Sequence, residues 1–336
     1  MKIRYSFFIL IIALTLFTVS VAFGQQSDRE AGINAFNGRN YPQAIQLLKK
    51  ATKNNGSDAE AWHYLGASYL GAERNKDAIK AMEKAVSLEQ ANDRFLSGLS
   101  YAYMRSFDPR ASSTATKALE ANVNNPQAHY VLGILAFRNG SFGAAYERAK
   151  RTITLMPDYA GAFLLKSESL VSSFSVQTGT VQRNLSYKHD LLSEAATDLE
   201  RYVSLISENK ERQRQTEYLA SLKFFADYYN RPENQKVISI DKEVPDPTAT
   251  NLKIISKSPA PYTVEARSNN ISGTIRLLIE FATDGKVRNI LITKRLGNGL
   301  DENAIDAARN IRFTPATRNG VPFSVVKTVE YSFSIY

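Results

Sequence analysis

The 336-residue sequence contains no cysteine and only three histidines. The absence of cysteine excludes disulfide bonds, thiolate metal sites and a cysteine nucleophile. His63, His129 and His189 lie far apart in the sequence and show no HExxH or other metal-ligand spacing. The sequence therefore predicts no metal site.

Motifs for catalysis and for nucleotide binding are also missing. There is no GxxxxGK[ST] phosphate loop and no GxSxG nucleophile motif, and "LGNGLD" (296–301) is interpreted as a loop. The paired acids Asp301 and Glu302 are explained by a helix N-terminus, whose dipole favours carboxylates. We expect a protein that is not an enzyme and needs no cofactor.

The charge is mildly basic, at +9, with 42 Lys and Arg against 33 Asp and Glu and no run of five like charges. A nucleic-acid footprint needs clustered basic residues, so the charge indicates a solvated surface and no nucleic-acid partner.

The N-terminus has the features of a secretory signal peptide over residues 1–24. Lys2 and Arg4 precede an apolar stretch, and the small residues Ala22 and Gly24 stand before a break at Gln25. The apolar stretch, of roughly 17 residues, is at the lower limit for spanning a bilayer, so an uncleaved anchor is the alternative. Either way the rest of the chain is exported, and only an uncleaved segment would attach it to a membrane.

A period of about 34 residues follows, seen when 41–55 is superposed on 75–89. Small residues keep the register at Ala44, Ala78, Ala111 and Ala145. The segment 59–85 resembles a tetratricopeptide repeat (TPR), and the matching residues are Trp62, Leu65, Gly66, Tyr69, Ala78 and Ala85. Departures at Gln90, at Gly98-Leu99 and at Met82 weaken single repeats only.

Four repeats are expected over 25–158, with Gly66 and Ala78 allowing the two helices of a hairpin to approach closely. A degenerate fifth repeat and a capping helix are expected over 159–230. Its helices are placed at about 160–175, from near Leu192, and at 209–230, with a polar insertion at 176–190.

The TPR resemblance implies a concave face that binds extended peptides. The expected groove positions are Phe36, His63, Leu70, Tyr103, Met104, Tyr130, Ile134, Phe137 and Arg138. Each apolar position could instead belong to the core. As a group, Tyr103, Tyr130, Phe137 and Arg138 are favoured, because aromatic residues and arginine dominate binding hot spots.

The helical period stops at Arg231, and a proline-containing linker is expected over 231–258, although "LKIISKS" (252–258) could pair with the domain beyond it. Next come a short helix at 262–267, strands at 273–281 and 286–295 joined at Asp284-Gly285, and a helix with Asp301 as N-cap. Asn319-Gly320 turns into the final strand.

The segment 259–336 is similar to the TonB C-terminal domain family. The resemblance is carried by Tyr262, Ala266, Arg267, Gly273, Asp284, Gly285, Leu300, Asp301, Ala304, Phe313, Pro315, Ala316, Asn319, Gly320 and Pro322. Thr263 and Gly297-Asn298-Gly299 depart from the family in loops. The expected fold is thus multidomain: an all-α TPR solenoid followed by a small α+β TonB-like domain with an antiparallel sheet.

The last strand has no successor, so it can lie at a sheet edge with unpaired backbone groups. The resemblance implies that this edge receives an extended peptide from an outer-membrane receptor by β-augmentation. The residues concerned are Val325, Val326, Lys327, Thr328, Val329, Glu330, Tyr331, Ser332 and Phe333. A capped or dimerised edge is the alternative.

The sequence therefore predicts an exported, non-enzymatic, protein-binding adaptor, periplasmic or anchored in the inner membrane and facing the periplasm. One alternative is a TonB-type energy transducer for receptor-mediated transport, and a weaker one is an anchor to the envelope or cell wall.

Overall fold

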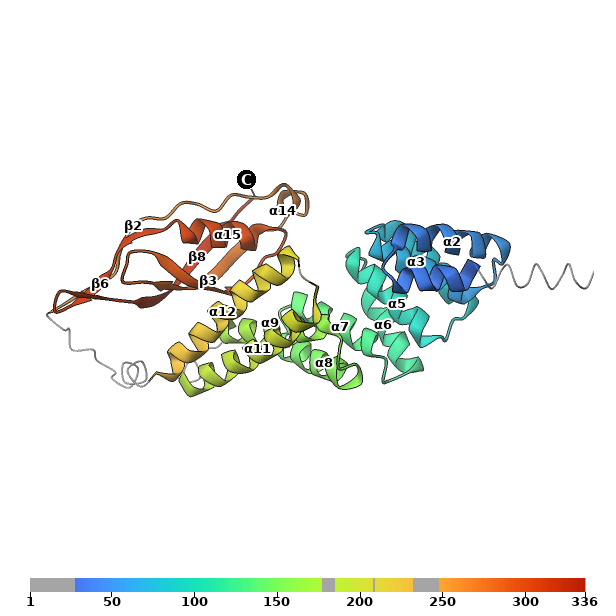
Figure 1. Cartoon of the computed structure of the whole chain (residues 1–336), viewed down its shortest axis with the longest axis horizontal. Coiled ribbons are helices and arrows are strands. Elements are labelled where there is room, and N and C mark those ends of the chain that lie inside the picture. The colour runs from blue at the N-terminus through green and yellow to red at the C-terminus, as the bar shows by residue number, and fades with distance from the viewer. Residues whose placement is uncertain (1–27, 177–184, 208, 232–247, 336) are drawn as a thin grey trace, which may run out of the picture. The chain divides into compact units, whose positions relative to one another are not determined.

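The computed structural model describes residues 28–176, 185–207, 209–231 and 248–335, and the chain divides into two compact units (Figure 1). Unit 1 comprises Met1–Asn139 and Arg151–Pro157, and unit 2 comprises Gly140–Lys150 and Asp158–Tyr336. The signal peptide expected at 1–24 lies outside the described residues. Within the described residues, none of the helices is long and apolar enough to cross a membrane.

Unit 1 is a succession of helices whose starts repeat. A helix over 28–37 is followed by α2 (Tyr41–Asn54), α3 (Ala59–Gly71), α4 (Asn75–Leu88), α5 (Asp93–Arg105), α6 (Arg110–Ala121) and α7 (Pro126–Arg138). Asp58, Asn92 and Asn125, each one repeat apart, accept backbone N–H bonds at the starts of α3, α5 and α7. The same N-cap therefore begins the first helix of each of these hairpins.

Small residues bring the paired helices together, as the sequence predicts. Ala44 and Ala78 are fully buried, and Ala111 is almost so. A Cβ atom at Gly66 would lie 2.5 Å from the Met82 Cγ of α4. A larger residue at this position would separate α3 from α4.

The helical part of unit 2 holds the first residues of α8 (Phe142–Leu155), then α9 (Ala160–Val176), α11 (Leu185–Leu205) and α12 (Lys210–Asn230). α11 begins earlier than the expected start near Leu192. Two contacts fix its first turns: His189 Nδ1 lies 2.9 Å from the Ala226 carbonyl of α12, and Lys188 lies over the ring of Tyr229. The rest of the expected insertion, 177–184, lies outside the described residues.

The terminal part of unit 2 has the predicted order of elements with short strands added. Its elements are β1 (Ala249–Thr250), β2 (Lys253–Ser256), α14 (Val264–Ser268), β3 (Gly273–Phe281), β4 (Val287–Lys294), α15 (Leu300–Arg309), β5 (Arg312–Thr314), β6 (Ala316–Arg318), β7 (Val321–Phe323) and β8 (Val325–Phe333). The strand orders are β4-β3-β8, β2-β5 and β1-β6-β7. β8 pairs antiparallel with β3 from Gly273↔Phe333 to Phe281↔Val325.

β1 and β2 change the expected limits of the linker. They fall within 231–258, yet β1 pairs with β6 and β2 pairs with β5. The chain from Ala249 onward therefore belongs to the folded terminal domain, and 232–247 lies outside the described residues.

Both faces of the β4-β3-β8 sheet are covered. On one face Ile275, Leu277, Ile279 and Phe281 join a core that includes α15. On the other face, Leu278 and Leu291 pack in a cluster with α9, α11 and α12. Helices α9, α11 and α12 thus share a hydrophobic core with the sheet.

The expected N-cap at Asp301 is wrong by two residues. α15 begins at Leu300 and is preceded by Gly299, which has φ 75° and offers no side chain for capping. The Asp301 carboxylate instead accepts bonds from the Leu296 and Gly297 N–H groups at 3.0 and 3.3 Å. It therefore holds the loop that leads into the helix.

Candidate peptide-binding sites

Three of the expected groove residues in unit 1 are buried. Tyr103 and Met104 are each 4% exposed, and His63 is 9% exposed. The Tyr103 hydroxyl donates to Glu83 Oε1 at 2.7 Å, and the Arg110 guanidinium lies 4.1 Å above its ring. Tyr103 thus links helices of the solenoid, so the expectation that it contacts a ligand is corrected.

His63 is held between α3 and α5. Its ring stacks on Phe95 at a centroid distance of 5.0 Å, and the space that Gly98 leaves is filled by His63 Cε1. Burial, assisted by the Arg94 charge, lowers the pKa of His63 to about 4. At neutral pH it is therefore an uncharged core side chain.

The remaining groove positions reach the surface of unit 1. Phe36, Leu70, Tyr130, Ile134 and Phe137 are half-buried, and Arg138 is exposed. Arg138 donates to the Met104 carbonyl at 3.0 Å, and its guanidinium stacks 4.5 Å from the Phe107 ring centre. These six side chains are the accessible part of the expected groove.

Two tyrosines that the sequence analysis omitted extend this aromatic surface. Tyr64 meets Phe36 edge-on at 5.5 Å, and Tyr101 lies 6.4 Å from Tyr130. Both are half-buried and lie on α3 and α5. Their position on the first helix of a repeat, the helix expected to line the groove, could have identified them from the sequence.

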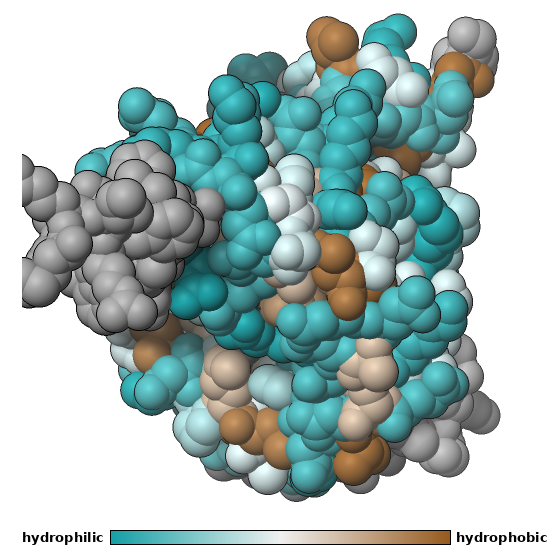
Figure 2. Space-filling model, turned by 90° about the vertical axis from the view of Figure 1, so that its right-hand side faces the viewer, coloured by the Kyte–Doolittle hydropathy of each residue, from teal (hydrophilic) through white to brown (hydrophobic). Residues whose placement is uncertain are grey.

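The surface shown in Figure 2 is mostly hydrophilic, with apolar residues in separate spots rather than one continuous patch. A large continuous apolar patch would mark a hydrophobic protein interface.

In unit 2, side chains along strand β8 alternate between exposed and buried from Thr328 to Phe333. Val329, Tyr331 and Phe333 are buried in the core that includes α15, while Thr328 and Ser332 are exposed. Val326 is half-buried and packs toward the helical cluster of unit 2. Both faces of the strand therefore contribute to holding it in place.

The two backbone edges of β8 have different neighbours: the inner edge faces β3, and the outer edge faces away from it. In the described part of the chain, β8 pairs with β3 and with no other strand. Lys257 Nζ donates to the Glu330 carbonyl at 2.6 Å. The Glu330 side chain bonds to Arg276 Nε of β3 at 2.8 Å, which fixes the cross-strand register.

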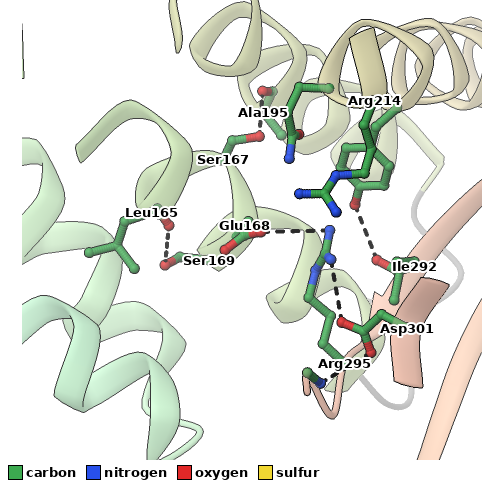
Figure 3. A network of polar contacts seen from close by, with 12 residues as sticks. Leu165, Ser167, Glu168, Ser169, Ala195, Arg214, Ile292, Arg295 and Asp301 are labelled. Atoms are coloured by element: carbon green, nitrogen blue, oxygen red, sulfur yellow. Dashed lines mark hydrogen bonds and ion pairs between the residues drawn. The ribbon is translucent and has the colours of Figure 1, made fainter. Parts of the chain in front are cut away.

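A polar cluster that sequence reasoning missed joins α9 to the terminal domain (Figure 3). Arg295 lies 3.6 Å from Glu168 of α9 and 3.5 Å from Asp301, and its guanidinium lies 5.2 Å from the Tyr218 ring centre. The Tyr218 hydroxyl donates to the Ile292 carbonyl of β4 at 3.2 Å. No sequence pattern pairs residues so far apart.

Burial changes the titration of this cluster. It raises the pKa of Glu168, against the opposing effect of Arg295. Burial would lower the pKa of Arg295, but Glu168, Tyr218 and Asp301 outweigh it and keep the guanidinium charged. The cluster borders a cavity of about 370 Å³ lined by residues of α9, α12, β4 and α15.

The described residues contain no group of three or more His, Asp or Glu side chains that could hold a metal ion. The two candidate sites are the accessible aromatic side chains of unit 1 and the edge of β8 that is not paired with β3.

Comparison with family models identifies both domains. Residues 43–161 match the "Cytochrome c-type biogenesis protein H TPR domain", and residues 258–335 match the "Gram-negative bacterial TonB protein C-terminal" domain. A TPR domain and a TonB C-terminal domain are thus both present, as the sequence predicts.

Individual relatives are distant. The chain is 24% identical over 115 residues to the cytochrome c-type biogenesis protein CycH of Pseudomonas aeruginosa, covering 33% of this chain and 28% of the relative. A thermophilic TPR protein of Thermus thermophilus is 18% identical with a TM-score of 0.47, covering 60% of this chain and 99% of its own. PilW, a type IV pilus biogenesis factor, is 18% identical with a TM-score of 0.47, covering 64% of this chain and 98% of its own.

Proposed function

Because the chain carries both a TPR domain and a TonB C-terminal domain, we propose that it is an exported, non-enzymatic adaptor of the cell envelope that binds extended peptides. TPR domains bind protein or peptide partners, and the matched TonB and CycH descriptions are those of envelope proteins. Catalysis forms no part of this proposal.

The first proposed site is the edge of β8, where a partner strand adds to the sheet. The observation that carries this proposal is the pairing of β8, which spans nine residues on one edge only in the described residues. A strand added there would gain backbone hydrogen bonds, which give affinity whatever the side chains of the partner.

The second proposed site is the aromatic surface of unit 1. Phe36, Tyr130, Phe137 and Arg138 remain accessible there, with Tyr64 and Tyr101 beside them. Aromatic side chains contribute much affinity at little cost in conformational entropy, and arginine is also enriched among binding hot spots.

The edge is tested with peptides of eight to ten residues selected from a random library on the full chain. Hydrogen exchange should show protection of 325–333 on binding. An N-methylated copy of the same peptide should bind at least roughly ten-fold more weakly, because it cannot donate backbone bonds. Equal binding of both copies would contradict strand addition.

The groove is tested with library peptides whose binding protects the amides of α7, and not those of 325–333, from hydrogen exchange. Replacing Tyr130 and Arg138 together by alanine should weaken these peptides by about ten-fold or more. The control is Tyr187→Ala, which alters an exposed tyrosine of unit 2. Unchanged affinity of the double variant would exclude the groove.

A second candidate function is a TonB-type energy transducer, favoured by the match of 258–335 to the TonB C-terminal model. It requires the N-terminal segment to stay in the inner membrane. The intact mass of the exported protein separates the two: retention of residues 1–24 supports the transducer, and their loss excludes it.

A further inference from the structure

The segment between β2 and α14, residues 257–262, contacts the last strand, β8. Lys257 directly follows β2, and 258–262 leads toward α14. Figure 1 shows this stretch on the same side of the unit as the C-terminal end of the chain. Lys257 Nζ donates to the Glu330 carbonyl at 2.6 Å and lies 4.5 Å above the Tyr331 ring.

The contact continues to the end of β8. The ring of Tyr262 meets Phe333 edge-on at 5.6 Å, and Ala260 and Tyr262 pack against the core that contains Tyr331. Residues 257–262 therefore contact the C-terminal part of β8, at the Glu330 carbonyl and at the side chains of Tyr331 and Phe333.

Two prolines explain why this segment lies beside β8 without forming a strand. Pro259 and Pro261 have no backbone N–H group. Because they alternate, both missing donors fall on the same side of an extended chain. Proline and lysine at a sheet edge are devices by which proteins prevent unwanted strand pairing.

We propose that residues 257–262 are an edge guard of β8, which a partner strand must displace from Glu330 before it pairs along the whole strand. This inference rests on the proposed docking at β8 and assigns its regulation. The Lys257 ammonium donates a hydrogen bond to the Glu330 carbonyl, which an incoming backbone N–H group would otherwise use as its acceptor.

Displacement is feasible because Lys257 is exposed and its ammonium is easily hydrated. Val325 to Val329 precede the guarded part, so pairing would begin there and extend toward Phe333. The guard thus lowers the affinity of a strand that pairs along the whole of β8, whereas a strand that pairs only with Val325 to Val329 leaves the Lys257 contact in place.

The test uses the full chain and a fluorescein-labelled peptide copying Gly273–Phe281, the sequence that already pairs with β8. Lys257→Met removes the ammonium and keeps the apolar stem. Lys286→Met, in the exposed turn between β3 and β4, is the matched control for loss of one positive charge. Fluorescence anisotropy gives the affinity, and hydrogen exchange of 325–335 reports the edge directly.

The expected result for Lys257→Met is an affinity about five-fold tighter, as loss of one competing charged hydrogen bond allows, and faster exchange of 325–335 without peptide. Lys286→Met should match the parent chain in both. If the peptide binds all three chains equally, or if exchange is unchanged, the guard is overturned while docking at β8 stands. If exchange rises but the peptide binds none of the chains, the guard contact is real and the proposed docking fails.

Discussion

The helical hairpins of unit 1 and helices α9, α11 and α12 of unit 2 are stabilised in different ways. In unit 1, α3, α5 and α7 begin at an Asp or Asn cap, and close packing depends on alanine and glycine. In unit 2, Tyr159 occupies the position one repeat after Asn125, and Glu168 of α9 pairs with Arg295 of the terminal domain.

The difference follows from what each helix packs against. A repeat stacked on another repeat needs a small, apolar and regular surface. α9 and α12 contact β4, a strand with side chains of several kinds. The repeat pattern fades where the neighbour is a sheet, because a helix packed on a sheet does not need the small, regular surface that stacking of repeats requires.

The largest expected effect comes from disrupting the core that α9, α11 and α12 share with the sheet. Phe225 of α12 is fully buried in the cluster with Leu278 and Leu291. Phe225→Ala should cost about 3–5 kcal/mol of unfolding free energy. Hydrogen exchange should accelerate in α12 and also in β3 and β4.

Leu48→Ala is the matched control, because Leu48 is fully buried in unit 1. It should accelerate exchange in α2 and α3. If Phe225→Ala leaves the strands protected, the helices and the sheet do not share a core.

The next prediction concerns the stability of unit 1 at acidic pH. The folded-state pKa of His63 is lowered to about 4, below the ordinary 6.5, chiefly by burial. His63 therefore contributes stability that is present above pH 6.5 and is lost as pH falls through about 4. The loss is up to about 3 kcal/mol.

This loss is measured as the free energy of unfolding in urea at several pH values between 7 and 4, monitored by hydrogen exchange in α3 and α5. His63→Leu should flatten the pH dependence of these helices, and His189→Gln should not. An unchanged slope in His63→Leu would show that other groups cause the acid sensitivity.

Unit 2 should respond with the opposite sign. Burial raises the folded-state pKa of Glu168 above its ordinary 4.5. Its contribution to stability is fully present below pH 4.5 and is lost as pH rises through the raised value. The protection factors of the α9 amides, which correct for the intrinsic pH dependence of exchange, should rise as pH falls toward 4.5, and Glu168→Gln should reduce that rise.

A smaller effect tests the ion pair itself. The Glu168 and Arg295 side chains are 22% and 24% exposed, so solvent screens them partly. Arg295→Met should cost about 1–3 kcal/mol, less than breaking a fully buried pair. Arg288→Met, which breaks the exposed pair with Asp284, should change stability far less. Equal losses in the two variants would show that the Arg295 pair adds nothing beyond a surface contact.

Periodic features of this chain could be predicted from the sequence, and features between distant segments could not. The close approach at Gly66 and the strand at 273–281 follow from local pattern alone. The burial of Tyr103 could not be predicted, because a tyrosine at helical spacing suits a core and a groove equally well. It was decided by Glu83 and Arg110, which lie on neighbouring helices.

The same limit applies to the terminal domain. Its order of elements follows from turn residues and alternation, but the cover over its second face comes from α9 and α12. Leu278 interrupts the alternation of 273–281, and this is the one local sign that both faces of β3 are buried. The prolines of 231–258 suggested a linker, and β1 pairs with β6 against that expectation. The pairing of β2 with β5 confirms the alternative that 252–258 pairs with the terminal domain.

The smallest expected effect concerns the N-cap residues that begin the helices of unit 1. Asn125 is 5% exposed, accepts from Ala128 N at 2.9 Å, and donates to Asp93 Oδ2 at 2.7 Å. Asn125→Ala should cost about 1–2 kcal/mol, since it removes a cap and a link to the preceding repeat. Asn40→Ala, at the exposed cap of α2, should cost about 0.5–1 kcal/mol, because only the cap is lost. Chemical denaturation of both variants gives the difference, and equal costs would mean that the cap position serves each helix alone and contributes nothing to the stacking of repeats.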